Sequence, residues 1–196
     1  MTLHIYPDAN HHSCKQTQKK FEKYVDGLFE RYSKLLLLRV DFAYRKNSSD
    51  FLHQDIPGLC ADMMRFEYQL ENISGVSGYI WIAEQGDRHG HHVHAAVFVN
   101  AQKRNKSWPV YQEISAAWED VTNDNGYAHY CKPEPHHTAQ AGKVIHFSDV
   151  SGISDMKIIT SYLAKSRQKP DGIIFSIRDL PEVHSSGRKR IYPGSY

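Results

Sequence analysis

The chain has 196 residues, of which 40% are hydrophobic and 12% aromatic. This size and composition predict a single globular domain with a sizeable core. No apolar run approaches the roughly 18 residues needed to span a bilayer, and the N-terminus lacks the basic and apolar segments of a signal peptide. The net charge of only +2 does not mark the whole chain as a nucleic-acid-binding protein.

The three cysteines are scattered, with no Cys-x-x-Cys pair among them. This pattern indicates free thiols in a reducing compartment and argues against a structural zinc site. We therefore expect a cytoplasmic protein.

Spacings of three and four residues between apolar side chains predict helices at about 15–33, 58–70, 109–121 and 156–168. Ser154 and Asp155 are the expected cap of the last helix. Continuous or alternating apolar runs predict strands at about 35–44, 79–84, 92–99, 127–131, 144–147 and 172–177. Residues 1–14 and the polar segment 46–57 are expected to be irregular.

The order of these elements predicts an α+β fold with a mostly antiparallel central sheet and helices packed on it. We expect the helices over one face and the histidines of a central strand on the other. Residues 1–196 form one predicted domain. It comprises an N-terminal helix at about 15–33, a core at about 35–169 and a basic C-terminal tail at 170–196.

A predicted β-hairpin at residues 79–100, YIWIAEQGDRHGHHVHAAVFVN, carries the main candidate site. Side chains alternate along a strand, so His92 and His94 point to the same face. Glu84 lies near the end of the partner strand, where the hairpin can bring its carboxylate beside them. Two imidazoles and a carboxylate on adjacent strands predict a divalent-metal site with open coordination positions.

The histidine pair alone is weak evidence, because the chain has 13 histidines, and an ordinary pair of surface histidines remains the alternative. Asp41 and Arg39 share a face of the strand at 35–44. Asp41 is thus a candidate metal-adjacent group, although an ordinary carboxylate at a strand end is the competing interpretation. His91 is a further candidate ligand if the strand twists at its entrance.

The ordered set of Glu84, His92-Val93-His94 and a later helix carrying Tyr162-Leu163-Ala164-Lys165 resembles the HUH (His-hydrophobic-His) endonucleases. That superfamily includes rolling-circle replication initiators, relaxases and single-strand transposases. The segments RVDFAY, EQGDRHGHHVHAAVF and SYLAKS look most similar to replication proteins of filamentous phages (inovirus type) and to YagK/YfjJ-type prophage proteins. The resemblance covers roughly residues 35–169 and implies a ferredoxin/RRM-like HUH nuclease fold.

The resemblance implies a metal-dependent, sequence- or structure-specific endonuclease and strand transferase that nicks single-stranded DNA to initiate rolling-circle replication. Tyr162 would be the nucleophile that forms a 5′-phosphotyrosine, and Lys165 would stabilise the phosphate or the phenolate. A tyrosine hydroxyl has an ordinary pKa of about 10, so it needs an activated electrophile. The implied cofactor is Mg²⁺ or Mn²⁺ held by Glu84, His92 and His94, and histidine ligands favour Mn²⁺.

The implied partners are single-stranded DNA or a DNA hairpin at a replication origin and host replication proteins in the bacterial cytosol, with no membrane. Basic clusters in loops and in the tail are the candidate phosphate contacts. They are Lys103, Arg104, Lys106, Arg167, Lys169, Arg188, Lys189 and Arg190. Trp81, Trp108 and Tyr111 can stack bases, but burial in the core is the expectation for each.

Several alternatives stay open. Tyr162 can be a core aromatic, with Tyr111, Tyr127 or Tyr130 as substitute nucleophiles, and Ser166 four residues later indicates a single-tyrosine enzyme. A transposase or relaxase of the same superfamily uses the same transesterification. A non-catalytic nucleic-acid-binding prophage regulator and a zinc metallohydrolase that activates water are the rivals outside it.

Overall fold

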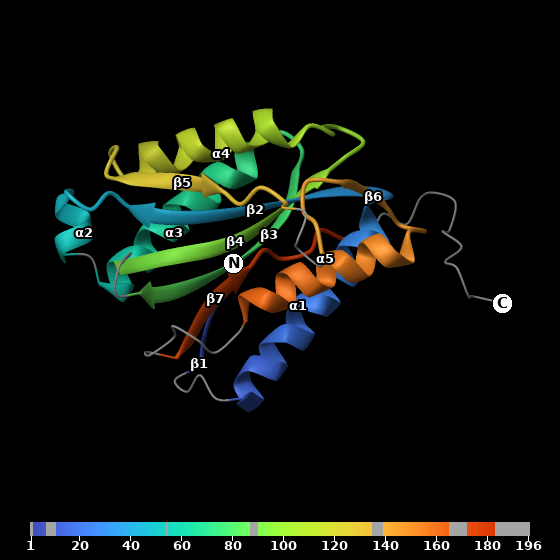
Figure 1. Ribbon diagram of the computed structural model, residues 1–196, viewed down its shortest axis with the longest axis horizontal. Coiled ribbons are helices and arrows are strands. Elements are labelled where there is room, and N and C mark those ends of the chain that lie inside the picture. Colours follow the sequence, from blue (N-terminus) through green and yellow to red (C-terminus); the bar gives the residue numbers. More distant parts are fainter. Residues whose placement is uncertain are drawn as a thin grey trace.

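One antiparallel sheet forms the centre of the molecule (Figure 1). The computed structural model describes residues 2–6, 11–53, 55–86, 90–134, 139–164 and 172–182. The strands are β1 (Thr2–Tyr6), β2 (Lys34–Tyr44), β3 (Val76–Gly86), β4 (Gly90–Asn100), β5 (Gly126–Tyr130), β6 (Val144–His146) and β7 (Ile173–Ile177). Their order is β1-β7-β3-β4-β2-β5, and β6 pairs with β2.

Every strand pair among the described residues is antiparallel. Five helices accompany the sheet within the described ranges: α1 (His11–Arg31), α2 (Ser49–His53), α3 (Ile56–Asn72), α4 (Ser107–Val121) and α5 (Val150–Leu163). The predicted α+β fold with a mostly antiparallel sheet is confirmed. None of the described helices combines the length and the apolarity needed to cross a bilayer.

Helices cover both faces of the sheet, so the expectation that they cover only one face was wrong. Helices α3 and α4 pack on one face and α1 and α5 on the other, as Figure 1 shows. The apolar run of β2 explains this arrangement, because successive side chains of a strand point to opposite faces. Leu36 and Leu38 enter the core under α3 and α4, and Leu35 and Leu37 enter the core under α1 and α5.

The β3–β4 hairpin lies in the middle of the sheet, between β7 and β2. Both strands are longer than predicted, 11 residues each, because both contribute side chains to both cores. In β4, Val93, Ala95, Val97 and Val99 face α3 and α4, whereas Ala96 and Phe98 face α1 and α5. The histidines of β4 therefore face α1 and α5, and not a face without helices.

Three elements differ from the sequence prediction. Residues 2–6, expected to be irregular, form strand β1, which pairs along β7. The segment expected as a polar loop contains the short helix α2, Ser49–His53. Helix α5 begins at Val150, because the Asp149 side chain accepts a hydrogen bond from the Gly152 amide at 2.9 Å and supplies the cap expected from Ser154 and Asp155.

Candidate metal centre

The register of the hairpin brings the three predicted ligands together. Glu84 of β3 and His92 of β4 are direct cross-strand partners, and His94 pairs with Ile82. Since side chains alternate along each strand, all three lie on the face that α1 and α5 cover. Glu84 and His92 are buried, and His94 is partly buried. The prediction that these residues meet is confirmed.

The ligand atoms of the three side chains converge. The Nε2 atom of His94 lies 3.2 Å from Oε2 of Glu84, and Nε2 of His92 lies 3.8 Å from the same oxygen. One ligand atom from each residue can be chosen so that all lie within 4.8 Å of one another. Ligand atoms about 2.1 Å from one ion are about 3.0–3.4 Å apart. The group can therefore hold a divalent metal ion after a small movement of His92.

Hydrogen bonds on the far nitrogen of each ring fix which nitrogen faces the site. The Nδ1 atom of His94 lies 2.6 Å from Oδ1 of Asp41, and Nδ1 of His92 lies 3.0 Å from the carbonyl oxygen of Gly90. With Nδ1 as the donor to these acceptors, the Nε2 lone pairs point toward Glu84. Metal-bound histidines in proteins almost always have such a partner on their other nitrogen.

Asp41 is itself held in position. The guanidinium group of Arg39 lies 3.2 Å from Oδ1 of Asp41 and donates to the carbonyl oxygen of Ala95 at 3.0 Å. The predicted shared face of Arg39 and Asp41 is confirmed, and Asp41, for which an ordinary strand-end carboxylate was the competing interpretation, lies beside the candidate ligand His94. The ion pair of Arg39 with Asp41 and the contact of the Gly90 carbonyl with His92 were not predicted from the sequence. The only sequence signal for Gly90 is its glycine identity, which suits its positive φ of 61°.

The charges of the site follow from burial and from these contacts. Burial opposes the ionised form of Asp41, but the hydrogen bond from His94 and the Arg39 and His94 charges outweigh it and lower the pKa of Asp41 to about 2. Burial lowers the pKa of His92. Burial also acts to lower the pKa of His94, but the hydrogen bonds to Asp41 and Glu84 prevail and raise it. The carboxylates of Asp41 and Glu84 thus favour a positive charge at His94.

His91 does not join the group. It pairs with Gln85 in the register of the hairpin, so its side chain belongs to the opposite face from His92. The metal-ligating group found among the described residues contains Glu84, His92 and His94 alone.

Tyr162 lies in the last turn of α5, beside the buried stripe formed by Met156, Thr160 and Leu163. Its side chain is 62% exposed, so it is not a core aromatic. Helix α5 packs on the same face of the sheet as the metal ligands. In Figure 1 its C-terminal end is directed toward the end of the sheet where β3 and β4 meet.

Among the substitute nucleophiles, Tyr127 shares the face of the metal ligands. It pairs with Ala43, which in turn pairs with His92. Tyr111 and Tyr130 pack against the core on the other face, under α4.

The predicted phosphate contacts are only partly described. Lys103 and Lys106 are exposed in the loop after β4, whereas Arg104 forms two hydrogen bonds to the carboxylate of Glu113, at 2.7 and 2.8 Å. The guanidinium of Arg104 is therefore engaged by an acidic neighbour. Lys165, Arg167, Lys169, Arg188, Lys189 and Arg190 lie outside the described residues.

No protein-family model, curated protein or solved structure matches the chain. The HUH resemblance therefore stays a prediction from the sequence motifs.

Proposed function

We propose that the protein is a metal-dependent nuclease and strand transferase that nicks single-stranded DNA through Tyr162 to initiate rolling-circle replication. The observation that supports this most is the convergence of Glu84 with the Nε2 atoms of His92 and His94. Both rings are oriented from behind by acceptors, as expected for ligands prepared for an ion.

Glu84, His92 and His94 would hold Mg²⁺ or Mn²⁺, and the two imidazoles favour Mn²⁺. When bound, such an ion supplies positive charge that stabilises a phosphodiester as it gains negative charge during attack. Asp41 would keep the His94 ring in place, and Arg39 would keep Asp41 in place. Because these supporting groups come from β2, three neighbouring strands, β3, β4 and β2, build the site.

Tyr162 would supply the nucleophile. Its phenolic oxygen would form a bond to phosphorus, and the bond between phosphorus and the 3′ oxygen would break. The phenol gives up a proton and the departing 3′ oxygen takes one, so the products are a 5′-phosphotyrosine and a free 3′-hydroxyl. The exposure of the Tyr162 ring and the position of α5 on the ligand face support this assignment. The reverse attack by a 3′-hydroxyl would rejoin the strand.

The proposal is tested by incubating the protein with a single-stranded DNA library and Mn²⁺ and locating any protein-linked nucleotide by mass spectrometry. We expect an adduct on Tyr162, and Tyr162→Phe should abolish it. The matched control is Tyr127→Phe, which removes the substitute nucleophile on the ligand face and should leave the adduct intact. An adduct on Tyr127 would overturn the assignment of the nucleophile and keep the reaction class.

A metallohydrolase that activates water is the second candidate, because two histidines and one glutamate also form hydrolytic zinc sites. It predicts cleavage without a covalent adduct and full activity of Tyr162→Phe. Binding of DNA with no cleavage in any metal would instead support the non-catalytic regulator. A transposase or relaxase would show the same adduct as a replication initiator, so the library must also identify the target sequence.

A further inference from the structure

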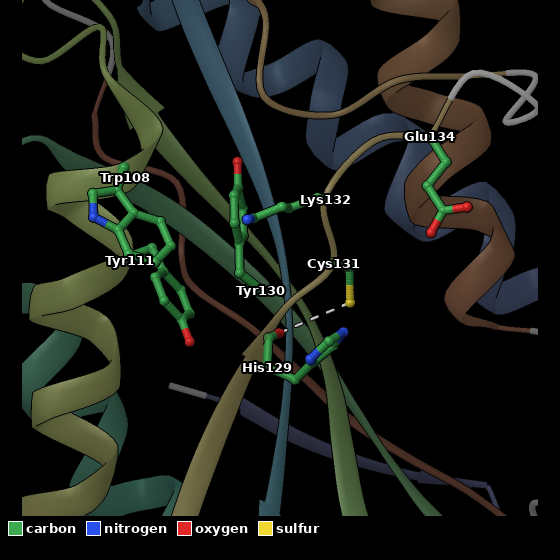
Figure 2. A pocket seen from close by; sticks show the side chains of 7 residues that line it. All are labelled: Trp108, Tyr111, His129, Tyr130, Cys131, Lys132 and Glu134. Atoms are coloured by element: carbon green, nitrogen blue, oxygen red, sulfur yellow. Dashed lines mark hydrogen bonds between the residues drawn. The ribbon is translucent and has the colours of Figure 1, made fainter.

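A pocket opens at the edge of the sheet, beside strand β5 and the first turn of α4 (Figure 2). Its volume is about 600 Å³, within the range of small-molecule and cofactor sites. Figure 2 shows three aromatic rings grouped on one side of it, with the amine of Lys132 directed toward them and Glu134 on the far side. The pocket thus presents aromatic faces and one cation to solvent.

The aromatic rings form a connected group. The ring centroids of Tyr111 and Tyr130 are 5.1 Å apart in a stacked arrangement, and those of Trp108 and Tyr111 are 5.2 Å apart. The hydroxyl of Tyr111 donates to the carbonyl oxygen of Ala128 at 3.0 Å. Since Tyr111 is anchored in this way, the group is held rigidly against β5.

Trp108 is 50% exposed, against the expectation that it is buried. The other two tryptophans, Trp81 and Trp118, are 1% and 0% exposed. The Nζ atom of Lys132 lies 5.7 Å from the centroid of the Trp108 ring. An exposed tryptophan beside tyrosines and a lysine is the composition that binds unpaired bases and their phosphates.

The pocket adjoins the metal centre through two of its lining residues. His129 of β5 pairs with Asp41, the residue bonded to His94. The thiol of Cys131 also lies against Asp41, and burial raises its pKa to about 12. Neighbouring strands are about 4.8 Å apart, so β5 lies roughly 10 Å from β4. Tyr130 pairs with Val40 and faces the α4 side of the sheet, so a single strand that runs from the metal centre to the aromatic rings passes over the edge strand β5.

We propose that this pocket stacks bases of single-stranded DNA close to the phosphate held at the metal centre. Trp108, Tyr111 and Tyr130 would take the bases, and Lys132 would contact the backbone. This inference rests on the proposed function, because it assumes that the metal centre acts on single-stranded DNA. It adds a base-binding subsite that the basic loops alone do not provide.

The test measures binding in EDTA, so that it does not depend on metal or on cleavage. The probe is an oligothymidylate of about 16 nucleotides, the upper end of site sizes for single-strand-binding folds. Because the other tryptophans are buried, quenching of tryptophan fluorescence should report stacking on Trp108. We expect the oligothymidylate to quench this fluorescence, and an abasic oligomer of equal length and charge to bind about tenfold more weakly.

Variants separate stacking from charge. Because the Trp108 variants lose the quenching signal, their binding is measured by the fluorescence anisotropy of a dye-labelled oligothymidylate. Trp108→Ala should weaken binding about tenfold, whereas Trp108→Phe keeps a ring and should retain most of the affinity. Tyr68→Ala, at a tyrosine 73% exposed on α3, is the matched control and should have no effect. Lys132→Gln should reduce the dependence of binding on salt by about one phosphate contact, and Lys23→Gln on α1 should not.

Equal binding of the abasic oligomer, or unchanged binding by Trp108→Ala, would overturn the proposal. Tighter binding of an oligouridylate would overturn the assignment to DNA in favour of RNA. If base stacking is not observed but a Tyr162 adduct still forms, the stacking proposal is wrong and the proposed nuclease activity is retained. If base stacking is observed but no adduct forms, the pocket binds single-stranded DNA and the proposed nuclease activity is wrong.

Discussion

Two carboxylates are buried against strand β3 on opposite faces of the sheet, and they meet different partners. Glu67 projects from α3 and accepts a hydrogen bond from the indole nitrogen of Trp81 at 2.5 Å. Glu84 belongs to β3 itself and meets the Nε2 atoms of His92 and His94. Both are nearly inaccessible to solvent, with 2% and 8% exposure, so burial alone does not separate them.

The difference lies in which partner supplies a proton. The indole of Trp81 is a donor only, so it hydrogen-bonds one oxygen of Glu67 without any added charge. An imidazole whose Nδ1 already donates has only a lone pair on Nε2, and a carboxylate facing it needs a proton or a cation between them. A buried carboxylate that faces imidazole nitrogens can thus share either a proton or a metal ion with them, whereas Glu67 faces a group that can only donate.

The largest expected effect comes from Glu84→Gln. The change replaces an anionic ligand by a neutral amide, so the affinity for Mn²⁺ should fall by more than about 100-fold, the upper range for changes outside the ligand set. Isothermal titration calorimetry with Mn²⁺ measures this directly. Glu67→Gln is the matched control on the opposite face and should bind Mn²⁺ normally. Unchanged affinity in Glu84→Gln would show that the ion, if bound, is held elsewhere.

A smaller loss is expected from changes at Asp41. In Asp41→Asn the amide oxygen can still accept from Nδ1 of His94, but the negative charge that favours the ligand is lost. We expect Mn²⁺ affinity to fall about tenfold in Asp41→Asn and closer to about 100-fold in Asp41→Ala, which removes the acceptor as well. Equal affinities for both variants and the parent protein would show that the ring of His94 is oriented by other contacts.

The smallest effect is expected from Glu67→Gln, measured as the free energy of unfolding against pH. Burial raises the pKa of Glu67 despite its hydrogen bond from Trp81. The folded protein therefore holds this proton more tightly than the unfolded chain, and stability is lost as pH rises through the raised pKa. A glutamine keeps an acceptor for Trp81 and does not ionise.

Glu67→Gln should thus match the parent protein near pH 4, around the ordinary glutamate pKa, and exceed its stability by about 1 kcal/mol at neutral pH. Chemical denaturation at a series of pH values measures the difference. A loss of stability at neutral pH would show that the charge of Glu67 is needed.

The candidate metal centre could be predicted because it depends on local rules. The alternation of side chains placed His92 and His94 on one face, and the antiparallel pairing of the two strands brought Glu84 opposite His92. Strand β1 could not be predicted, because its five residues alone carry no clear strand pattern. Its partner β7 lies about 170 residues away in the sequence. The continuous apolar run at the start of β2 is typical of a strand covered on both faces, and the second helical layer agrees with it.

The exposure of Trp108 also escaped prediction. It lies at the start of α4, just before Val110, the first residue of the buried stripe, and residue type alone favours burial. The ring lies beside β5, which ends the sheet on that side, and half of it is open to solvent.

The pairing of Glu84 with His92 ties the candidate site to the arrangement of the whole hairpin. A shift of β4 by a single residue would turn both histidines into the core beneath α3 and α4, and would move Ala95 and Val97 out of it. A one-residue change in the register of β4 therefore removes both histidines from the face of Glu84 at once. Binding of the paramagnetic ion Mn²⁺ would then report whether a protein with substitutions in either hydrophobic core has kept the register of β4 against β3.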